Sequence, residues 1–285
     1  MSMKTPASCQ NQRVKLISLK ENNMYKLILY MGLLLMSAFV WASPNCFVAQ
    51  ENNKIIQAIG ACEVQHSPRC SFNIPLSLIA FEEGLLLDAR HPKKAFNQNY
   101  VDGRAVCEQA TDPRHWIKNS CVWYSQWITE SLGMKVFQEY INAFDYGNTD
   151  LSGDLGKHNG LTRAWLNSSL KISPKEQIVF LQKMLNRQFS LKPEAYEHTK
   201  QILFVEKLPN GWTLYGKTGT GTPPNKDAIR SGWFVGWIEK DKQSIIFAQY
   251  IEVGIDETPN GMYAGPYAKE LAKEQLMQFL KTKGR

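Results

Sequence analysis

The sequence predicts an α/β domain of the α+β type, in which an antiparallel sheet is flanked by N- and C-terminal helices and an all-helical lobe is inserted between its strands. One observation is that strand-like segments lie near both ends of the chain, at 47–59 and 212–253, with helical patterns between them. Another is that segment 76–81 is apolar on nearly every side, as is typical of a helix in the middle of a domain. We therefore expect residues 43–285 to form a single domain, with a helical lobe at roughly 70–200.

Each element of this fold has its own signal. The first hairpin has apolar strands on either side of the polar turn 51–54, and Gly133 separates two helices of the lobe. Ser173, Pro174 and Glu176 form a capping box with proline in the first turn, which predicts the start of a helix. In chain order we expect strands at 47–49 and 55–59, helices at 76–81, from 112 to a break at 120–122, and at 123–132, 135–144 and 173–186, strands at 212–216, 232–239 and 244–253, and a helix at 264–281.

The first 42 residues have the pattern of a cleaved secretory signal. Lys26 precedes an almost uninterrupted apolar run from Leu27 to Trp41, and small residues mark a cleavage position after Ala42. The run is shorter than the roughly 20 residues of a membrane-spanning helix, and no basic stop follows it. We expect export to the periplasm without a membrane anchor after cleavage, and the sequence leaves open whether the chain starts at Met1 or Met24.

The charge distribution does not favour a nucleic-acid partner. The chain has a formal net charge of +7, and the leader contributes five basic residues and one acidic residue, or +4. The mature chain is therefore near +3, without basic clusters or a recognition motif. No internal repeat or low-complexity run is visible.

The cysteines are odd in number once the leader has been removed. Cys9 lies in the leader, and five cysteines remain, so at least one thiol is unpaired in an oxidising compartment. Cys46 and Cys62 flank the predicted hairpin and are the first candidate disulfide. Cys121 lies in an apolar helical context, which predicts a packed thiol, and Cys107 has no predicted role.

Cys70 lies where the central helix begins. Free backbone N–H groups and the helix dipole stabilise a thiolate or a developing oxyanion at such a position. Two interpretations compete, a buried structural thiol and a nucleophile. Cys70 considered alone favours the structural thiol, and only the motifs that follow change this preference.

Three short motifs follow Cys70 in the chain. They are Ser120-Cys121-Val122, Tyr146-Gly147-Asn148 and Lys217-Thr218-Gly219, the last directly after a predicted strand. On a strand, Lys-Thr-Gly supplies a positive charge and a hydroxyl for a carboxylate, and its glycine lets a ligand approach the backbone. In this order, and together with Trp165-Leu166 and the segments 123–126 and 153–154, the motifs resemble those of the class D (oxacillinase-type) β-lactamases over about residues 45–280.

The resemblance implies a β-lactamase/transpeptidase-like fold and a role for each motif. In this family a serine at the start of the central helix attacks the β-lactam carbonyl. A lysine one turn later, carbamylated in class D, is the base for acylation and for the deacylating water. This Ser-x-x-Lys motif reads Cys70-Ser71-Phe72-Asn73 here. The resemblance assigns catalysis to Cys70, Ser120 and Lys217, substrate binding to Asn73, Val122, Trp165, Thr218, Gly219 and Thr220, and the oxyanion hole to the N–H groups of Cys70 and Thr220.

The two replaced positions differ in their consequences. Cysteine keeps a nucleophile at position 70, whereas asparagine at position 73 has no useful proton affinity near neutral pH and cannot form a carbamate. General-base assistance is typically worth about 10²–10⁴ in rate, so we expect deacylation to suffer most. Trp165, which steadies the carbamate in the family, lacks that partner here, and the family's further carboxylate-binding arginine has no counterpart at 263–269.

Three functions are compatible with this sequence. The first is a β-lactam-reactive enzyme that is acylated on Cys70 and turns over poorly. The second is a catalytically inactive homologue that binds a cell-wall ligand or a periplasmic partner through the same cleft. The third, a β-lactam sensor domain, ranks last because no transmembrane signalling segment accompanies the fold. The expected ligand is a β-lactam or peptidoglycan-like small molecule, without a cofactor or metal ion, and the oligomeric state is left open.

Overall fold

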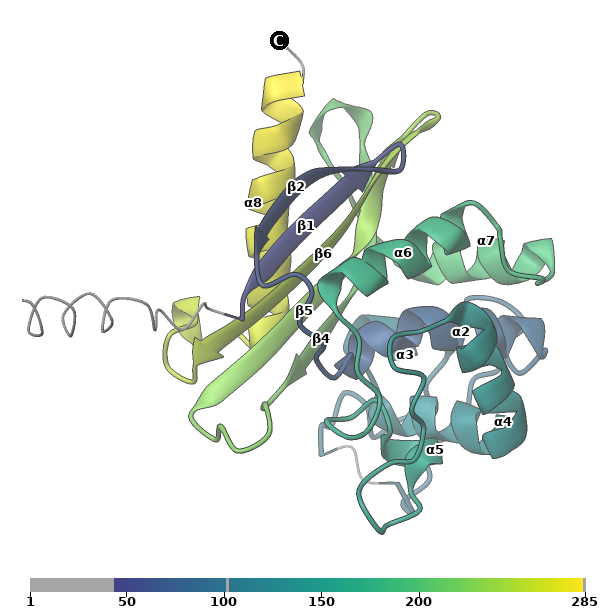
Figure 1. Ribbon diagram of the computed structural model, residues 1–285. Helices are drawn as coiled ribbons and strands as arrows, with labels where there is room; N and C mark the ends of the chain where they lie inside the picture. The colour runs from purple at the N-terminus through teal and green to yellow at the C-terminus, as the bar shows by residue number, and fades with distance from the viewer. Residues whose placement is uncertain (1–43, 101–102, 284–285) are drawn as a thin grey trace, which may run out of the picture. The chain divides into compact units, whose positions relative to one another are not determined.

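The computed structural model describes residues 44–100 and 103–283, and its centre is a six-stranded antiparallel sheet (Figure 1). The first hairpin lies beside the last strand, so the N-terminal and C-terminal strands of the chain are neighbours in the sheet. Its turn places Asn52 and Asn53 at φ 50° and 62°, a left-handed conformation that asparagine tolerates. The spatial order is β2 (Lys54–Gly60), β1 (Cys46–Glu51), β6 (Gln243–Gly254), β5 (Ile229–Lys240), β4 (Thr213–Gly221) and β3 (Phe204–Lys207).

Helices cover both faces of this sheet. α8 (Ala264–Lys283) packs against β4, β5 and β6, and α6 (Pro174–Leu185) packs against β1 and β6 on the opposite face (Figure 1). Successive side chains of β5 point to opposite faces and are buried on both, because Trp233 belongs to the core on the lobe side and Phe234 to the core under α8. Gly232 lets α8 approach the sheet, since a Cβ there would lie 2.1 Å from the carbonyl oxygen of Ala264.

The lobe is built around α2 (Asn73–Glu82), which is buried from Asn73 to Phe81. This helix packs against α4 and α7 and follows directly from the short 3₁₀ turn η1 (Arg69–Phe72). A helix that is apolar all round needs such surroundings, as its sequence predicts. The other helices of the lobe are α3 (Pro113–Asn119), α4 (Val122–Phe144), α5 (Gly160–Arg163) and α7 (Pro193–Ile202), and two further 3₁₀ turns are η2 (Pro209–Gly211) and η3 (Pro259–Gly261).

The sheet, the inserted lobe and the terminal helix confirm the predicted fold class. Two boundary signals are also confirmed, because Gly133 interrupts α4 at φ 73° and Ser173 forms a capping box with Glu176 at the start of α6. β3, α5 and α7 are not among the predicted elements. β3 is a four-residue edge strand, and α7 follows Lys192, whose side chain makes no capping hydrogen bond.

Two disulfides join cysteines of the described residues, and one of them corrects a prediction. Cys46 and Cys62 are joined with an S–S distance of 2.01 Å, which confirms the pair predicted from the hairpin. Cys121 is bonded to Cys107 at 2.07 Å, so the prediction of a packed thiol at Cys121 is wrong. The reason is that Cys121 lies in extended conformation at the break between α3 and α4, where the loop carrying Cys107 folds back on it. Among the cysteines of the described ranges, only Cys70 is free.

The predicted export signal at 1–42, the choice between Met1 and Met24, and any helix N-terminal to β1 concern residues 1–43, which lie outside the described residues. They therefore stay predictions. Within residues 44–100 and 103–283, no helix is long and apolar enough to cross a membrane.

Candidate active site

The turn that carries Cys70 is fixed by its backbone. Cys70 lies in η1, which leads directly into α2. Arg69 adopts φ 55°, and its N–H donates to the carbonyl oxygen of Trp165 at 3.0 Å. The Ser71 hydroxyl donates to the carbonyl oxygen of Pro68 at 2.7 Å. A non-glycine residue at positive φ costs of order 1–3 kcal/mol and persists only where its surroundings hold it. The half-buried, free thiol of Cys70 is thus presented on a rigid turn.

Lys217 and Ser120 form one cluster with Cys70. The Nζ of Lys217 donates to the Oγ of Ser120 and, at 2.9 Å, to the carbonyl oxygen of Thr218. Lys217 is only 3% exposed, and this burial lowers the pKa of its amine to about 8. A thiolate at Cys70 acts in the opposite direction, while Arg104 adds to the lowering. Lys217 therefore interacts electrostatically with the sulfur of Cys70 as well as with the hydroxyl of Ser120.

Ser120 is held in place by two independent constraints. It ends α3 in left-handed conformation, at φ 55° and ψ 46°. The guanidinium of Arg104 donates to the carbonyl oxygens of Asn119 and Ser120, at 2.8 and 2.6 Å. The next residue, Cys121, is bonded to Cys107. These contacts stabilise a backbone conformation that serine rarely adopts and keep its hydroxyl on Lys217.

β4 runs close to the Cys70 turn because Gly219 has no side chain. A Cβ at Gly219 would lie 3.2 Å from the backbone nitrogen of Ser71. The hydroxyl of Thr220 accepts a hydrogen bond from the N–H of Gly265 at 3.0 Å, which anchors the end of β4 to the start of α8. The backbone of residues 219–220 is therefore adjacent to the turn of Cys70, as the predicted oxyanion hole requires.

Asn73 occupies the position of the family's base and is 1% exposed. Its Oδ1 accepts a hydrogen bond from the Ser125 hydroxyl at 3.2 Å, and that hydroxyl accepts one from the indole of Trp116 at 2.8 Å. Its Nδ2 has no hydrogen-bond partner among the residues that the structure describes. A carboxamide donates and accepts hydrogen bonds but does not take up a proton near neutral pH, so this position offers no base.

Trp165 contacts the Cys70 turn, and Val122 follows the disulfide-bonded Cys121 at the start of α4. The buried ring of Trp165 stacks on Phe72, with 5.3 Å between ring centroids and 21° between planes. Its carbonyl oxygen holds the N–H of Arg69, so Trp165 supports the turn from behind. Val122 is half-buried and begins α4 directly after Cys121.

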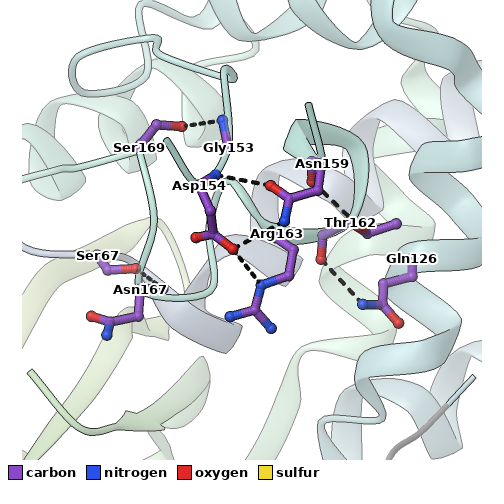
Figure 2. Close-up of polar contacts among 9 residues, drawn as sticks. All are labelled: Ser67, Gln126, Gly153, Asp154, Asn159, Thr162, Arg163, Asn167 and Ser169. Atoms are coloured by element: carbon purple, nitrogen blue, oxygen red, sulfur yellow. Dashed lines mark hydrogen bonds and ion pairs between the residues drawn. The ribbon is translucent and has the colours of Figure 1, made fainter. Parts of the chain in front are cut away.

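A hydrogen-bonded loop, residues 145–170, braces the segment before Cys70 (Figure 2). The carboxylate of Asp154 accepts from Asn159 Nδ2 at 3.0 Å and from Arg163 Nε at 3.1 Å. The Oγ of Ser67 accepts from the backbone N–H of Asn167 at 2.8 Å, and its own hydrogen bonds the Trp165 carbonyl. The loop thereby fixes the entry to the Cys70 turn.

Gly147 and Asn148 of the Tyr146-Gly147-Asn148 motif belong to this loop, whereas the ring of Tyr146 packs edge-to-face on Phe72 of the Cys70 turn, with 5.7 Å between ring centroids. A Cβ on Gly147, which has φ 60°, would lie 2.0 Å from the carbonyl oxygen of Lys171. The Asn148 amide accepts from the N–H of Lys171 and donates to the carbonyl oxygen of Ser169, both at 2.9 Å. Gly147 and Asn148 therefore hold the start of the loop against residues 169–171.

A basic cavity of about 570 Å³ opens beside Lys217 and Thr218. Arg114, Lys118 and Lys269 also line it, and none of its described lining residues is acidic. Sequence reasoning missed these three residues. The only signal for them was the four-residue spacing of Arg114 and Lys118, which places both on one face of α3.

Comparisons with known proteins agree with this geometry. Residues 42–277 match the family described as penicillin binding protein transpeptidase domain. The chain is 38% identical over 213 residues to β-lactamase OXA-9 of Klebsiella pneumoniae, which covers 72% of this chain and 77% of that protein. It is 40% identical over 198 residues to β-lactamase OXA-1 of Escherichia coli, which covers 69% and 68% respectively.

Two solved structures have the same fold. The class D β-lactamase OXA-427 is 38% identical with a TM-score of 0.79, and the match covers 84% of this chain and 99% of that one. The C-terminal domain of the BlaR penicillin receptor of Bacillus licheniformis is 25% identical with a TM-score of 0.70, covering 86% and 92%.

Proposed function

The chain belongs to the class D β-lactamase family, and we propose that it is a periplasmic protein that reacts with β-lactams such as penicillins through Cys70 and releases the acyl group slowly. The observation that carries this proposal is the hydrogen bond from Lys217 to Ser120 next to a free thiol. These groups suit the opening of a β-lactam ring, whereas position 73 lacks the group that would activate water.

In the acylation step, the sulfur of Cys70 attacks the carbonyl carbon of the β-lactam, and the ring C–N bond breaks. The thiol proton passes to the neutral amine of Lys217, and the hydroxyl of Ser120 relays a proton to the ring nitrogen that leaves. The products are a thioester on Cys70 and an amine in the opened ligand, so no atom is gained or lost. The N–H groups of Cys70 and Thr220 stabilise the oxyanion that forms in between.

The lowered pKa makes Lys217 a workable base. A lysine at the usual pKa of 10.5 is neutral in about three molecules in ten thousand at pH 7, whereas a pKa of about 8 leaves about a tenth neutral. Proton transfer then needs no charge to be created on a distant group. The charge of Cys70 raises the pKa of Lys217, so the ammonium and the thiolate stabilise each other once the proton has moved.

Release of the acyl group requires an activated water, and Asn73 does not activate one. The loss of general-base assistance slows this step by about 10²–10⁴. Acylation keeps a base in Lys217, so the covalent intermediate accumulates. A penicillin receptor domain has the same fold at 25% identity, which supports a use of this architecture in penicillin recognition rather than rapid turnover.

The basic cavity fits the anionic part of the ligand. Penicillins carry a carboxylate at neutral pH, and Thr218 supplies a hydroxyl at one edge of the cavity, next to the amine of Lys217. Arg114, Lys118 and Lys269 add positive charge around it without an acidic counterpart in its described lining. Such a single-sign cleft raises the local concentration of an anionic ligand.

A catalytically inactive homologue that binds a peptidoglycan-like ligand or a periplasmic partner is the second candidate. The observation that favours it is that positions 70 and 73 both depart from Ser-x-x-Lys while the surrounding cleft is kept. This candidate requires binding without a covalent adduct.

Intact-mass spectrometry after incubation with a penicillin tests the proposal. We expect one adduct with the full mass of the penicillin, located on Cys70, absent from Cys70→Ala, and persistent after free ligand is removed. A chromogenic β-lactam should show a burst of about one equivalent followed by slow turnover. Saturable binding without an adduct supports the inactive homologue, and fast multiple turnover by the wild-type protein refutes slow release.

A further inference from the structure

A second cavity lies beside the Cys70 turn, and we propose that it binds a small oxyanion, a phosphate or carboxylate group. Its volume is about 380 Å³, and it is lined by the segments 64–69 and 223–226, by Asn167 and Lys171, and by residues of β5 and β6. Cys70, Ser120 and Lys217 are not among its lining residues. The site is therefore separate from the cluster that reacts with β-lactams, and the proposal stands without that function.

Cationic side chains outnumber anionic ones in this cavity. Arg69, Lys171 and Lys226 line it together with a single acid, Glu252, so three charges minus one leave a net charge of +2. Glu252 is already engaged, because Lys226 lies 2.7 Å from it and the Tyr250 hydroxyl donates to it at 3.0 Å. Arg69 and Lys171 form no ion pair with any residue that the structure describes. The charge of Arg69 even lowers the pKa of Lys171, in addition to the effect of burial. An anion between these two cations removes their repulsion.

Arg69 is a donor built into the wall of the cavity. It is 8% exposed, and one of its guanidinium nitrogens donates to the carbonyl oxygen of Thr222 at 2.5 Å. Its head group packs on Gly221, where a Cβ would lie 2.3 Å from Cζ. Its Nε is buried without a hydrogen-bond partner in the described structure. Burial lowers the pKa of Arg69 to about 10, so it still carries its charge at pH 7. A buried charged donor without an acceptor costs about 1–3 kcal/mol or more, and an anionic oxygen satisfies it.

His66 supplies a second unpartnered group. Its Nε2 is buried and makes no hydrogen bond to the described residues, while its ring stacks on Tyr250 with 3.7 Å between centroids. Burial lowers the pKa of His66 to about 4. Lys226 and Lys171 contribute to the lowering, and Glu252 opposes it. His66 is therefore neutral at pH 7, and the tautomer with a proton on Nε2 donates to an anion.

Asn167 and the size of the cavity indicate what else the ligand carries. The Oδ1 of Asn167 is buried without a partner among the residues placed in the structure. It accepts from a hydroxyl or amide of the ligand, or the amide turns over and donates to the anion. A cavity of about 380 Å³ lies within the range of small-molecule sites and is larger than a bare phosphate needs. The occupant we infer is a small organic molecule with one phosphate or carboxylate group.

Binding at this site acts on the neighbouring turn. Arg69 directly precedes Cys70, holds a positive φ of 55°, and is tied to Trp165 through its N–H. An anion on its guanidinium stabilises this conformation only in the folded state, so the ligand raises the thermal midpoint of unfolding as its concentration rises.

Inorganic phosphate is the probe for the test, with sodium chloride at equal ionic strength as the reference. We expect phosphate to raise the midpoint of thermal unfolding saturably and to shift the His66 ring resonances in NMR spectra at pH 7. Lys171→Gln should weaken phosphate binding by about tenfold, the loss of one charge-assisted contact. Lys157→Gln, which removes an exposed lysine outside the cavity, is the matched control and should leave the affinity unchanged.

Acetate in place of phosphate distinguishes the two chemistries, since preferential binding of either identifies the group that the site recognises. The proposal is overturned if neither anion shifts the His66 resonances beyond the effect of chloride. It is equally overturned if Lys171→Gln and Lys157→Gln bind phosphate as tightly as the wild-type protein. The NMR measurement on the wild-type chain needs no variant and decides the question even if Lys171→Gln folds poorly.

Discussion

The burial of Lys217 implies a steep pH dependence for acylation of Cys70. The amine accepts a proton only in its neutral form, and its pKa is lowered to about 8. The neutral fraction is then about 1% at pH 6, about 9% at pH 7 and about 91% at pH 9. If Lys217 is the base, the rate constant of acylation rises about 90-fold from pH 6 to pH 9 and levels off above pH 8.

The measurement is the rate of adduct formation by rapid quench and intact mass at pH 6, 7, 8 and 9. Lys217→Gln removes the proton acceptor, so it should slow acylation at pH 9 by about 10²–10⁴ and abolish the inflection. Lys118→Gln is a matched control, because it removes a lysine that lines the same cavity. It should lower the rate by a similar factor at every pH and keep the inflection near 8.

A flat pH profile would show that Lys217 does not take the thiol proton. So would an inflection near pH 8 that persists unchanged in Lys217→Gln, since another group would then be titrating. Either outcome refutes the assignment of Lys217 as base, but neither affects the identity of the nucleophile, which the adduct on Cys70 establishes separately.

Three further predictions follow from the same contacts. Cys70→Ser combined with Asn73→Lys should raise the steady-state rate of hydrolysis of a chromogenic β-lactam by about 10²–10⁴, and either single change should raise it far less. An inert double variant would show that another part of the site is defective. Replacing Cys107 and Cys121 by serine removes a disulfide between residues 14 positions apart and should lower the free energy of unfolding, measured in urea titrations, by about 3 kcal/mol. Acylation should also become slower because the backbone of Ser120 loses its support. An unchanged acylation rate would contradict that support. The pKa of His66 is about 4 in the folded chain and 6.5 in the unfolded chain, so the unfolded state binds more protons between these values. The free energy of unfolding therefore falls as the pH drops from 6.5 to 4, by about 2 kcal/mol after a discount for the partial exposure of His66. His66→Phe should remove this acid sensitivity, and an equal loss of stability in that variant would assign it to other groups.

Local signals explain which parts of the fold the sequence predicts. The capping box at Ser173 and the break at Gly133 depend on neighbouring residues alone, and both are present in the structure. The Cys107–Cys121 bond depends instead on a loop that folds back onto the junction of α3 and α4. There the indole of Trp123 donates to the carbonyl oxygen of Cys107 at 2.7 Å, and Arg104 holds the end of α3. No periodicity within the loop encodes these contacts, because their partners lie on a different element and no hairpin pattern aligns them as it aligns Cys46 with Cys62.

The same distinction applies to the site. The order of the motifs is enough to predict that Cys70, Ser120 and Lys217 lie close together, because the family's fold determines where each motif lies. The basic residues of the 570 Å³ cavity come from α3, β4 and α8. The 380 Å³ cavity, for which we propose an anion, combines segments about 160 residues apart, from His66 to Lys226. Isolated basic residues on separate elements read as solvated surface in the sequence, so only their packing together reveals a site.

Asn73 stabilises the folded chain better than a lysine at the same position would. The side chain is 1% exposed on a helix that is buried from Asn73 to Phe81, so a lysine there would place an amine in the interior, away from solvent. An uncompensated buried charge costs several kcal/mol, and a neutral amine still leaves hydrogen-bonding capacity unmet. Asn73 instead pairs its Oδ1 with Ser125 and leaves only Nδ2 unpaired, at a cost of about 1–3 kcal/mol. Restoring a lysine at position 73 should therefore lower the midpoint of thermal unfolding even as it raises hydrolysis, because activity and burial make opposite demands on this position.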